Sequence, residues 1–343
     1  MKQKVTIYDI ARAAGVSQQT VSLALNNKGQ ISPATQARIL ALSKEMGYRP
    51  NRMAQAMRSS QSHIIGIVIP NINNPFFSEV VRGAQDTAKA NGYNTIISNT
   101  DNSQEIEELL GLVSHGIDGV ITFIHQSKDQ AIIDFANKFG PILLMNREFN
   151  TLPDHPSMAS ILVNSAGGAK SAVSHLVELG HKKIGMITGT PYHDRSPTGE
   201  TARAIGYREG LTEAGIEPDL ELLVEEHETL DGGYRAAKLL LQKRPDVTAI
   251  FAYNDLMAFG ALRAAHELGL AVPTDLSIIG FDDTELTTMS VPTLSTVQVD
   301  QYKMGQLAFE RLHALIQDPE SPRELINMQT KVIQRESTAV ARS

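Results

Sequence analysis

From residue 64 onward, short continuous apolar runs alternate with amphipathic stretches of helical periodicity. The runs are IIGIVI, NTIIS, GVITFI, PILLMN, SILV, KIGMITG, ELLVEE, AIFAYN and LSIIGF. Helices are predicted to begin between them, near Phe77, Gln104, Lys128, Ser165, Thr201, Leu230 and Asp255. Buried strands separated by amphipathic helices are typical of parallel sheets covered on both faces. Nine strands are too many for one ordinary sheet, so the pattern predicts an α/β core of two doubly wound halves that divide near Asn164.

The start of the chain follows a purely helical pattern. Thr6 is a good N-cap, and Asp9 lies in the first turn, where a carboxylate favours the positive end of the helix dipole. Gly15 then breaks the apolar spacing, and Ser17 offers a second N-cap for a helix over residues 18–26. Two short helices joined by a glycine turn predict a helix-turn-helix.

The second of these helices has an unusual outward face. Its predicted outward residues are two amides, a hydroxyl and one aliphatic group: Gln18, Gln19, Ser22 and Leu23. Solvent-exposed positions more often carry Lys and Glu. In the DNA major groove, Gln can bind the edge of adenine and Leu can lie on a thymine methyl group. The alternative is a capped helix pair inside an ordinary all-helical domain.

A third helix and a short linker follow. Ser32 caps the third helix, which is predicted to end at Gly47. Beyond it, Asn51 can cap a short helix that carries Ala54 and Met57 on one face. Such a short helix does not persist alone in water. It is therefore either an ordinary interdomain linker or a segment that folds in the DNA minor groove, where apolar side chains can wedge a base step.

Charge is segregated along the chain. Residues 1–60 contain nine Lys or Arg and two acidic residues, a net charge of +7, whereas the whole chain carries −7 and the remainder therefore −14. A basic N-terminal segment followed by an acidic remainder is typical of a nucleic-acid-binding segment attached to a domain that does not bind DNA. Phosphate contacts are predicted from helix starts, polar side chains and one arginine: Thr6, Ser17, Thr20, Asn26, Ser32, Arg49 and Asn51.

Composition and missing motifs argue against other classes of protein. No window approaches the roughly 18 apolar residues of a membrane helix, and the N-terminus lacks an apolar signal region, so we expect a cytoplasmic protein. The chain has no Cys, which excludes disulfides and thiolate ligands. It also lacks GxGxxG, GxxxxGK, HExxH and GxSxG, so no cofactor, metal or catalytic residue is predicted.

An enzyme on the same α/β layers stays open as an alternative. Asp282-Asp283 could be a carboxylate pair, but adjacent residues at a strand end point to opposite sides. His181, in ELGHKKIG, precedes a strand and is interpreted as a turn residue. A transport protein that binds sugar is a second alternative, and it would require a secretory signal.

Several longer segments occur in a specific order. They are TIYDIARAAGVSQQTVSLALN, ISPATQARI, GYRPNRMAQAM, IGIVIPNINNPFFSEVVRGAQ, RAIGYREGL, AIFAYNDLMAFGALRA and LSIIGFDDTE. This set resembles the lactose-repressor/galactose-repressor (LacI/GalR) family of bacterial transcription regulators, from Val5 to about Ser337.

The resemblance implies a specific domain organisation. A helix-turn-helix headpiece would span residues 1–49 and a hinge helix residues 50–62. The core would resemble periplasmic sugar-binding proteins, with an N-terminal subdomain of residues 63–163 plus 293–322 and a C-terminal subdomain of residues 164–292 plus 323–343. The chain would cross between the subdomains near Asn164, Pro292 and Pro322, and the helix over 302–316 would belong to the N-terminal subdomain.

The effector would bind between the subdomains, at the carboxyl ends of strands. The resemblance assigns contacts to Phe76, Asn146, Arg203, Asn254 and Asp282, and Asn74 and Arg147 lie beside them at strand ends. Their amides, charges and aromatic face suit a polyol, although an Asn or Asp alone at such a place is more often a turn or cap residue. Arg147 with Arg195 would instead fit a phosphate or another anion, and residues 191–201 are predicted to form a lid.

The function implied is that of a ligand-responsive repressor of a carbohydrate-utilisation operon. A homodimer on a pseudopalindromic operator is expected, because the sequence ends without the Leu-heptad tail of the lactose repressor. Relatives often carry Arg, the commonest reader of guanine, at the position of Leu23, so the half-site should differ there. Met57 stands where the hinge wedge is usually Leu, which predicts the same DNA bend with a modest change in affinity.

Overall fold

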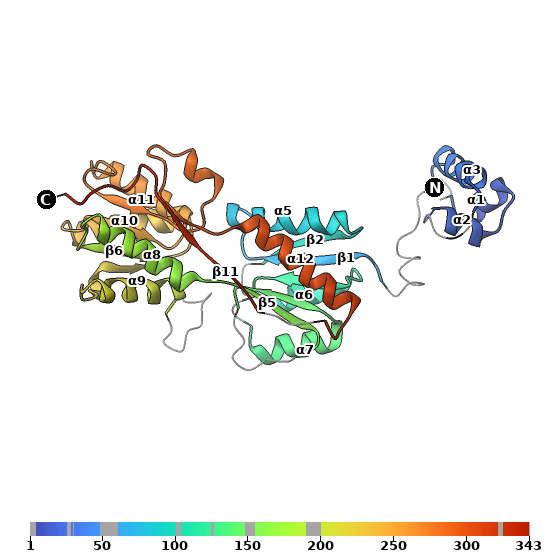
Figure 1. Ribbon diagram of the computed structural model, residues 1–343, viewed down its shortest axis with the longest axis horizontal. Coiled ribbons are helices and arrows are strands. Elements are labelled where there is room, and N and C mark those ends of the chain that lie inside the picture. Colours follow the sequence, from blue (N-terminus) through green and yellow to red (C-terminus); the bar gives the residue numbers. More distant parts are fainter. Residues whose placement is uncertain are drawn as a thin grey trace. The chain divides into compact units, whose positions relative to one another are not determined.

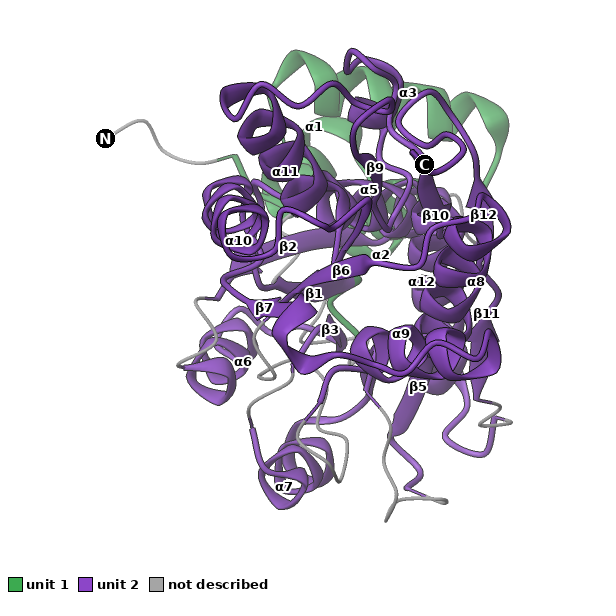
Figure 2. Cartoon of the chain, turned by 90° about the vertical axis from the view of Figure 1, so that its left-hand side faces the viewer, with its two compact units in different colours: residues 1–63 green, residues 64–343 purple. Residues whose placement is uncertain are grey.

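The protein divides into two compact units, residues 1–63 and 64–343, which Figure 2 shows in two colours. The computed structural model describes residues 5–25, 29, 31–48, 61–100, 104–124, 127–147, 155–189, 200–321 and 325–342. In the described residues, no helix is long and apolar enough to cross a membrane.

Unit 1 is a small all-helical domain. Its helices are α1 (Ile7–Ala14), α2 (Gln18–Leu25) and α3 (Pro33–Glu45). Gly15 ends α1 in the left-handed conformation, with φ of 62°, which allows the tight turn into α2. The core is formed by small and β-branched apolar side chains from all three helices: Ile10, Ala11, Ala14, Val21, Ala24 and Ile39. The predicted helix-turn-helix and third helix are confirmed.

The first part of unit 2 is built on a six-stranded parallel sheet, which we call the N-terminal subdomain. Its strand order is β11-β5-β4-β3-β1-β2. The strands are β1 (Ile64–Ile69), β2 (Asn94–Asn99), β3 (Gly119–Thr122), β4 (Ile142–Met145), β5 (Met158–Val163) and β11 (Ile326–Met328). Its helices are α5 (Pro75–Ala90), α6 (Glu105–Val113), α7 (Asp129–Phe139) and α12 (Gln301–Gln317).

The C-terminal subdomain has a second parallel sheet of order β7-β6-β8-β9. Its strands are β6 (Ile184–Thr188), β7 (Leu223–Glu225), β8 (Ala249–Ala252) and β9 (Ser277–Ile279). Its helices are α8 (Ser165–Glu178), α9 (Ala202–Glu213), α10 (Leu230–Lys243) and α11 (Asp255–Glu267), with 3₁₀ turns η1 (Leu220–Leu222) and η2 (Glu285–Thr288). A two-stranded antiparallel ribbon, β10 (Thr296–Gln298) with β12 (Lys331–Ile333), completes unit 2.

Helices cover both faces of each sheet, as predicted for doubly wound layers. One continuous apolar cluster lies under α5 and α12 in the N-terminal subdomain and under α8 and α9 in the C-terminal subdomain. Separate clusters lie under α6 and α7 and under α10 and α11. Figure 1 shows α12 running beside α5, which confirms that this late helix belongs to the N-terminal subdomain.

The crossings between the subdomains differ in part from the expectation. The first lies at Asn164, as predicted, because β5 ends one residue before it and α8 begins one residue after it. After Pro292, however, the chain still pairs with the C-terminal subdomain through the bridge Asp282↔Gln298, so the second crossing lies at residues 299–300. After residue 322 the chain still pairs with β5 through β11, so the third crossing lies at 329–330.

Candidate functional site

The outward face of α2 is as predicted from the sequence. The N–H of Thr20 donates to Ser17 Oγ at 3.1 Å, so Ser17 caps the helix. Val21 and Ala24 are buried in the core. The face opposite them carries Gln18 and Gln19, which are exposed, and Ser22 and Leu23, which are half-buried. This face can present amide groups to the edges of bases.

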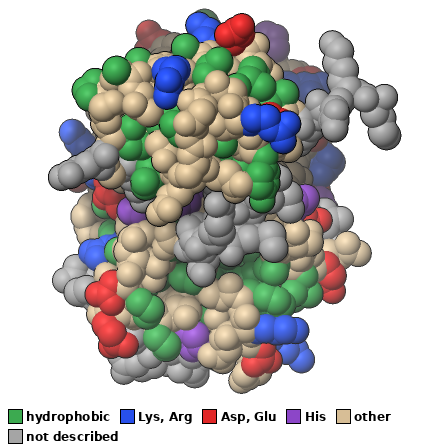
Figure 3. Space-filling model, turned by 90° about the vertical axis from the view of Figure 1, so that its right-hand side faces the viewer, with side chains coloured by type: hydrophobic (Ala, Val, Ile, Leu, Met, Phe, Trp, Pro, Cys, Tyr) green, Lys and Arg blue, Asp and Glu red, His purple; other side chains and the backbone are tan. Residues whose placement is uncertain are grey.

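Helix starts supply further polar groups in unit 1. The carboxylate of Asp9 accepts from the N–H of Thr6 at 2.9 Å and from its hydroxyl at 2.7 Å, and these bonds lower the pKa of Asp9. Ser32 caps α3 by accepting from the N–H of Thr35 at 3.2 Å. Figure 3 shows separated Lys and Arg side chains, with some acidic side chains, on the face turned to the viewer. The other predicted DNA contacts lie outside the described residues: Asn26, Arg49, Asn51, Ala54 and Met57.

In the N-terminal subdomain, two predicted effector residues fix the ends of elements. Asn74 caps α5, and its Oδ1 accepts from the N–H of Phe76 at 3.0 Å. Phe76 is buried and packs edge-on against Phe123, with ring centroids 6.2 Å apart. Asn146 follows β4 with a φ of 56°, and its Oδ1 accepts from the N–H of Val163 at 3.0 Å. Asn146 therefore joins the carboxyl ends of β4 and β5.

Arg147 is engaged within the N-terminal subdomain. Its guanidinium donates to the carbonyl oxygens of Ile124 at 3.1 Å and Ser127 at 2.6 Å, and to the carboxylate of Asp129 at 2.6 Å. Its side chain is only 9% exposed. These contacts hold the segment that leads from β3 to α7. Arg147 remains a predicted effector contact, because a guanidinium has five N–H donors and can bind several partners at once. Arg195 and residues 191–199 lie outside the described residues.

In the C-terminal subdomain, the predicted residues Arg203 and Asp282 are in contact, and Asn254 lies next to a residue that Arg203 binds. Arg203, near the start of α9, donates to the carbonyl oxygen of Tyr253 and, at 3.3 Å, to Oδ1 of Asp282. Its guanidinium also lies over the ring of Phe281, 3.8 Å from the centroid. Asn254 follows Tyr253 and caps α11 by accepting from the N–H of Met257 at 2.9 Å. The cation of Arg203 and the carboxylate of Asp282 are thus in contact where β8 and β9 end, and Asn254 directly follows the residue whose carbonyl Arg203 binds.

A neighbouring carboxylate, Asp255, was not predicted as a site residue. Asp255 is fully enclosed and accepts from the N–H of Thr284 at 2.8 Å and from the hydroxyl of Thr296 at 2.6 Å. Burial, and then the nearby charge of Asp282, raise the pKa of Asp255. Burial also raises the pKa of Asp282, although the guanidinium of Arg203 opposes that shift, and the carboxylate of Glu228 adds to it. In the sequence, the only signal that Asp255 belongs to this site is its position next to Asn254.

Asp282 and Asp283, the carboxylate pair considered for the enzyme alternative, do not act together. Asp282 faces Arg203, whereas Asp283 binds Arg335 at 2.6 Å, so the two adjacent carboxylates point to different partners. His181 lies in the turn between α8 and β6, where its N–H donates to the carbonyl of Leu176 at 3.1 Å, and its buried ring binds Thr248 at 2.9 Å. Asp282, Asp283 and His181 thus each bind partners within the protein.

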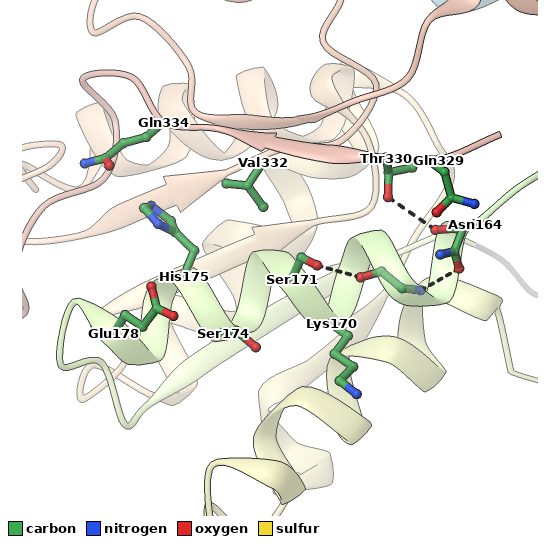
Figure 4. Close-up of a pocket in the computed structure, with 11 residues that line it drawn as sticks. Asn164, Lys170, Ser171, Ser174, His175, Glu178, Gln329, Thr330, Val332 and Gln334 are labelled. Atoms are coloured by element: carbon green, nitrogen blue, oxygen red, sulfur yellow. Dashed lines mark hydrogen bonds between the residues drawn. The ribbon is translucent and has the colours of Figure 1, made fainter.

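A separate groove lies along α8. Its volume is about 700 Å³, and Figure 4 shows α8 on one side and the segment from Gln329 to Gln334, which contains β12, on the other. The hydroxyl of Ser171 donates to the carbonyl of Gly167 at 2.9 Å, and His175 binds Thr338 at 3.3 Å. None of the seven predicted effector residues lines this groove.

Comparison with known proteins gives a consistent result over the whole chain. Residues 6–51 match "Bacterial regulatory proteins, lacI family", and residues 173–338 match the "Periplasmic binding protein-like domain". The chain is 32% identical to Catabolite control protein A of Priestia megaterium, over 97% of this chain and 99% of that protein. It is 33% identical to the Ribose operon repressor of Haemophilus influenzae, over 97% of this chain and 98% of that protein.

A solved structure agrees with these relatives. The Lac repressor dimer bound to operator and the anti-inducer ONPF is 28% identical, with a TM-score of 0.84 over 98% of this chain and 100% of that one. The chain therefore belongs to the lacI family of bacterial regulatory proteins, and it is a DNA-binding transcription regulator rather than an enzyme.

Proposed function

We propose that this regulator represses genes for carbohydrate use and that a sugar-like effector changes its affinity for DNA. The observation that carries the proposal is the contact of Arg203 with Asp282 and with the carbonyl of Tyr253, beside Asn254, at the carboxyl ends of β8 and β9. Ligands bind at such strand ends in open α/β sheets. Guanidinium, amide and carboxylate groups give directional bonds to adjacent hydroxyls. The names of the Ribose operon repressor and the Lac repressor support a sugar as the ligand class.

The proposed effector site has two walls. Arg203, Asn254 and Asp282 form the wall in the C-terminal subdomain. Phe76, Asn146 and Asn74 form the other, with Phe76 as an apolar face for the sugar ring. Arg147 follows Asn146 and belongs to this second wall, and its guanidinium also binds the carbonyl oxygens of Ile124 and Ser127.

The proposed DNA contacts follow from the exposed face of α2. Gln18, Gln19, Ser22 and Leu23 read bases in the major groove, since their side chains lie opposite the buried Val21 and Ala24. The helix starts and polar residues predicted from the sequence bind phosphate, and Ala54 and Met57 of the hinge bind the minor groove.

The proposed assembly is a homodimer on a pseudopalindromic operator in the cytoplasm. Support comes from the Lac repressor dimer bound to operator, which covers nearly the whole chain. A two-fold symmetric protein matches two half-sites related by the same symmetry.

A thermal-shift screen tests the effector site. Neutral sugars and phosphorylated sugars are added to the wild type, to Arg203→Ala and to Arg208→Ala. Arg208 is the matched control, because it is on the same helix but pairs with Glu200 at 2.6 Å instead of Asp282. We expect at least one neutral sugar to raise the melting temperature of the wild type and of Arg208→Ala but not of Arg203→Ala. A sugar that stabilises all three proteins equally would place the site elsewhere.

A further inference from the structure

The turn that carries Asp282 has an unusual backbone. Asp282 and Asp283 have φ values of 119° and 60°, in the region that favours glycine. Two consecutive residues other than glycine hold such a conformation only where surrounding contacts impose it. Because this turn aims the Asp282 carboxylate at Arg203, whatever imposes it also determines the geometry of the proposed effector site.

Asp283 is held by groups from two distant segments. Its Oδ1 accepts from the guanidinium of Arg335 at 2.6 Å, and its Oδ2 accepts from the amide of Gln298 at 2.7 Å. Arg335 also donates to the hydroxyl of Thr287 at 3.0 Å and to the carbonyl of Leu294 at 2.8 Å. The side chains of Arg335 and Asp283 are 18% and 10% exposed, so water screens this pair little.

The same turn is bonded to the second crossing between the subdomains. The N–H of Asp282 donates to the carbonyl of Val297 at 2.8 Å, and the N–H of Val299 donates back to the carbonyl of Asp282 at 3.2 Å. The side-chain amide of Gln301, at the start of α12, also donates to that carbonyl. The Asp282 turn is therefore attached directly to the segment that leads from the C-terminal into the N-terminal subdomain.

We propose that Asp283 and Arg335 are positioning residues that hold Asp282 toward Arg203 and tie it to the crossing at residues 298–301. The pair does not touch the effector. The turn is held in one conformation. When an effector binds Asp282 and displaces it, the residues bonded to the turn, Val299 and Gln301, are therefore displaced as well. The part about the effector rests on the proposed function, whereas the positioning of the turn does not.

Hydrogen exchange of the full-length protein, measured by mass spectrometry, tests the positioning role without any ligand. The variants are Arg335→Met and the control Arg244→Met. Arg244 is a matched control, since its side chain is 17% exposed and it binds Asp246 at 2.9 Å and Asp219 at 2.6 Å, away from the turn. We expect the amides of Asp282 and Val299 to exchange at least about tenfold faster in Arg335→Met and at an unchanged rate in Arg244→Met.

Amides of β8 serve as the reference for global unfolding. If they accelerate as much as Asp282 and Val299, or if the control gives the same pattern, Arg335 acts only on general stability and the proposal is overturned. Should Arg335→Met fail to fold, Gln298→Ala tests the positioning role in its place, because it removes one bond to Asp283 and Gln298 is exposed. It should accelerate exchange at Asp282 and Val299, and unchanged rates there would refute the positioning role. Arg335→Lys should restore part of the protection, since it keeps the charge.

The two proposals can fail separately. If Arg203→Ala leaves sugar binding intact, the effector site is wrong, but the exchange result for Arg335 still stands. If exchange at Asp282 does not depend on Arg335 while Arg203→Ala abolishes sugar binding, the effector site stands and the positioning role is wrong.

Discussion

Gln18 and Gln19 lie exposed on α2, while Val21 and Ala24 fill the core beneath them. This division could be predicted from the sequence, because it depends only on helical spacing and one N-cap. The environment of His181 could not. Its ring binds Thr248, Ser277 and the carbonyl of Ala339, which are 67, 96 and 158 residues away. Single-residue roles were predictable where the partners are local and not where they are distant.

Gln19→Ala should reduce discrimination at one base pair of the operator by about 1–3 kcal/mol, because a bidentate amide contact to a base is lost. Arg49→Ala should instead weaken binding to all sequences alike, since a phosphate contact carries no sequence information. Anisotropy titrations with a panel of single-substituted operators measure both. Equal losses on every sequence for both variants would contradict the assignment of Gln19 to a base.

His181 should make stability fall in acid. Burial lowers the pKa of His181 below its ordinary value of 6.5, so the folded state binds fewer protons than the unfolded state as the pH drops through that value. The melting temperature of the wild type should therefore fall between about pH 7.5 and 5.5. His181→Gln should flatten that dependence, whereas the control His115→Gln, at an exposed position, should leave it unchanged. A slope that is the same in all three proteins would rule out His181 as its source.

Helices and strands followed the sequence closely, because caps and apolar periodicity are local signals. The predicted strand at IIGIVI and the predicted helix capped by Ser32 are both observed. The crossings were less predictable. The pairing of Ile326 with Ile161 joins segments far apart in the chain, and no local pattern near residue 322 indicates it. Sheet membership depends on pairing between distant segments, which local periodicity does not encode.

The contact between α5 and α12 depends on glycine. A Cβ at Gly83 would lie 2.1 Å from the carbonyl oxygen of Tyr302, so a side chain there forces the helices apart. Gly83→Ala should cost about 1–3 kcal/mol in the free energy of unfolding. Gly111→Ala in α6 is the control, since nothing lies within 4 Å of its Cβ position, and it should stabilise by about 0.5–1 kcal/mol. Urea denaturation measures both, and a neutral Gly83→Ala would show that the helices are not so closely packed.

On the scale of the whole molecule, one unit carries the DNA-reading face and the other carries the polar groups at the strand ends. An effector can change DNA affinity only if it binds the DNA-competent and the incompetent states differently. Whether DNA affinity rises or falls depends on which of the two states the effector prefers. The size is the coupling free energy between the sites, typically about 1–3 kcal/mol.

The most direct test is a titration of the full-length protein with an operator selected from random duplex DNA, in the presence and absence of the sugar found by the thermal-shift screen. Fluorescence anisotropy reports the affinity. We predict that saturating sugar changes the operator affinity of the wild type by about 5- to 150-fold and leaves that of Arg203→Ala unchanged, although this variant still binds the operator without sugar. An operator affinity that is identical with and without a bound sugar in the wild type would contradict the link between the effector site and DNA binding.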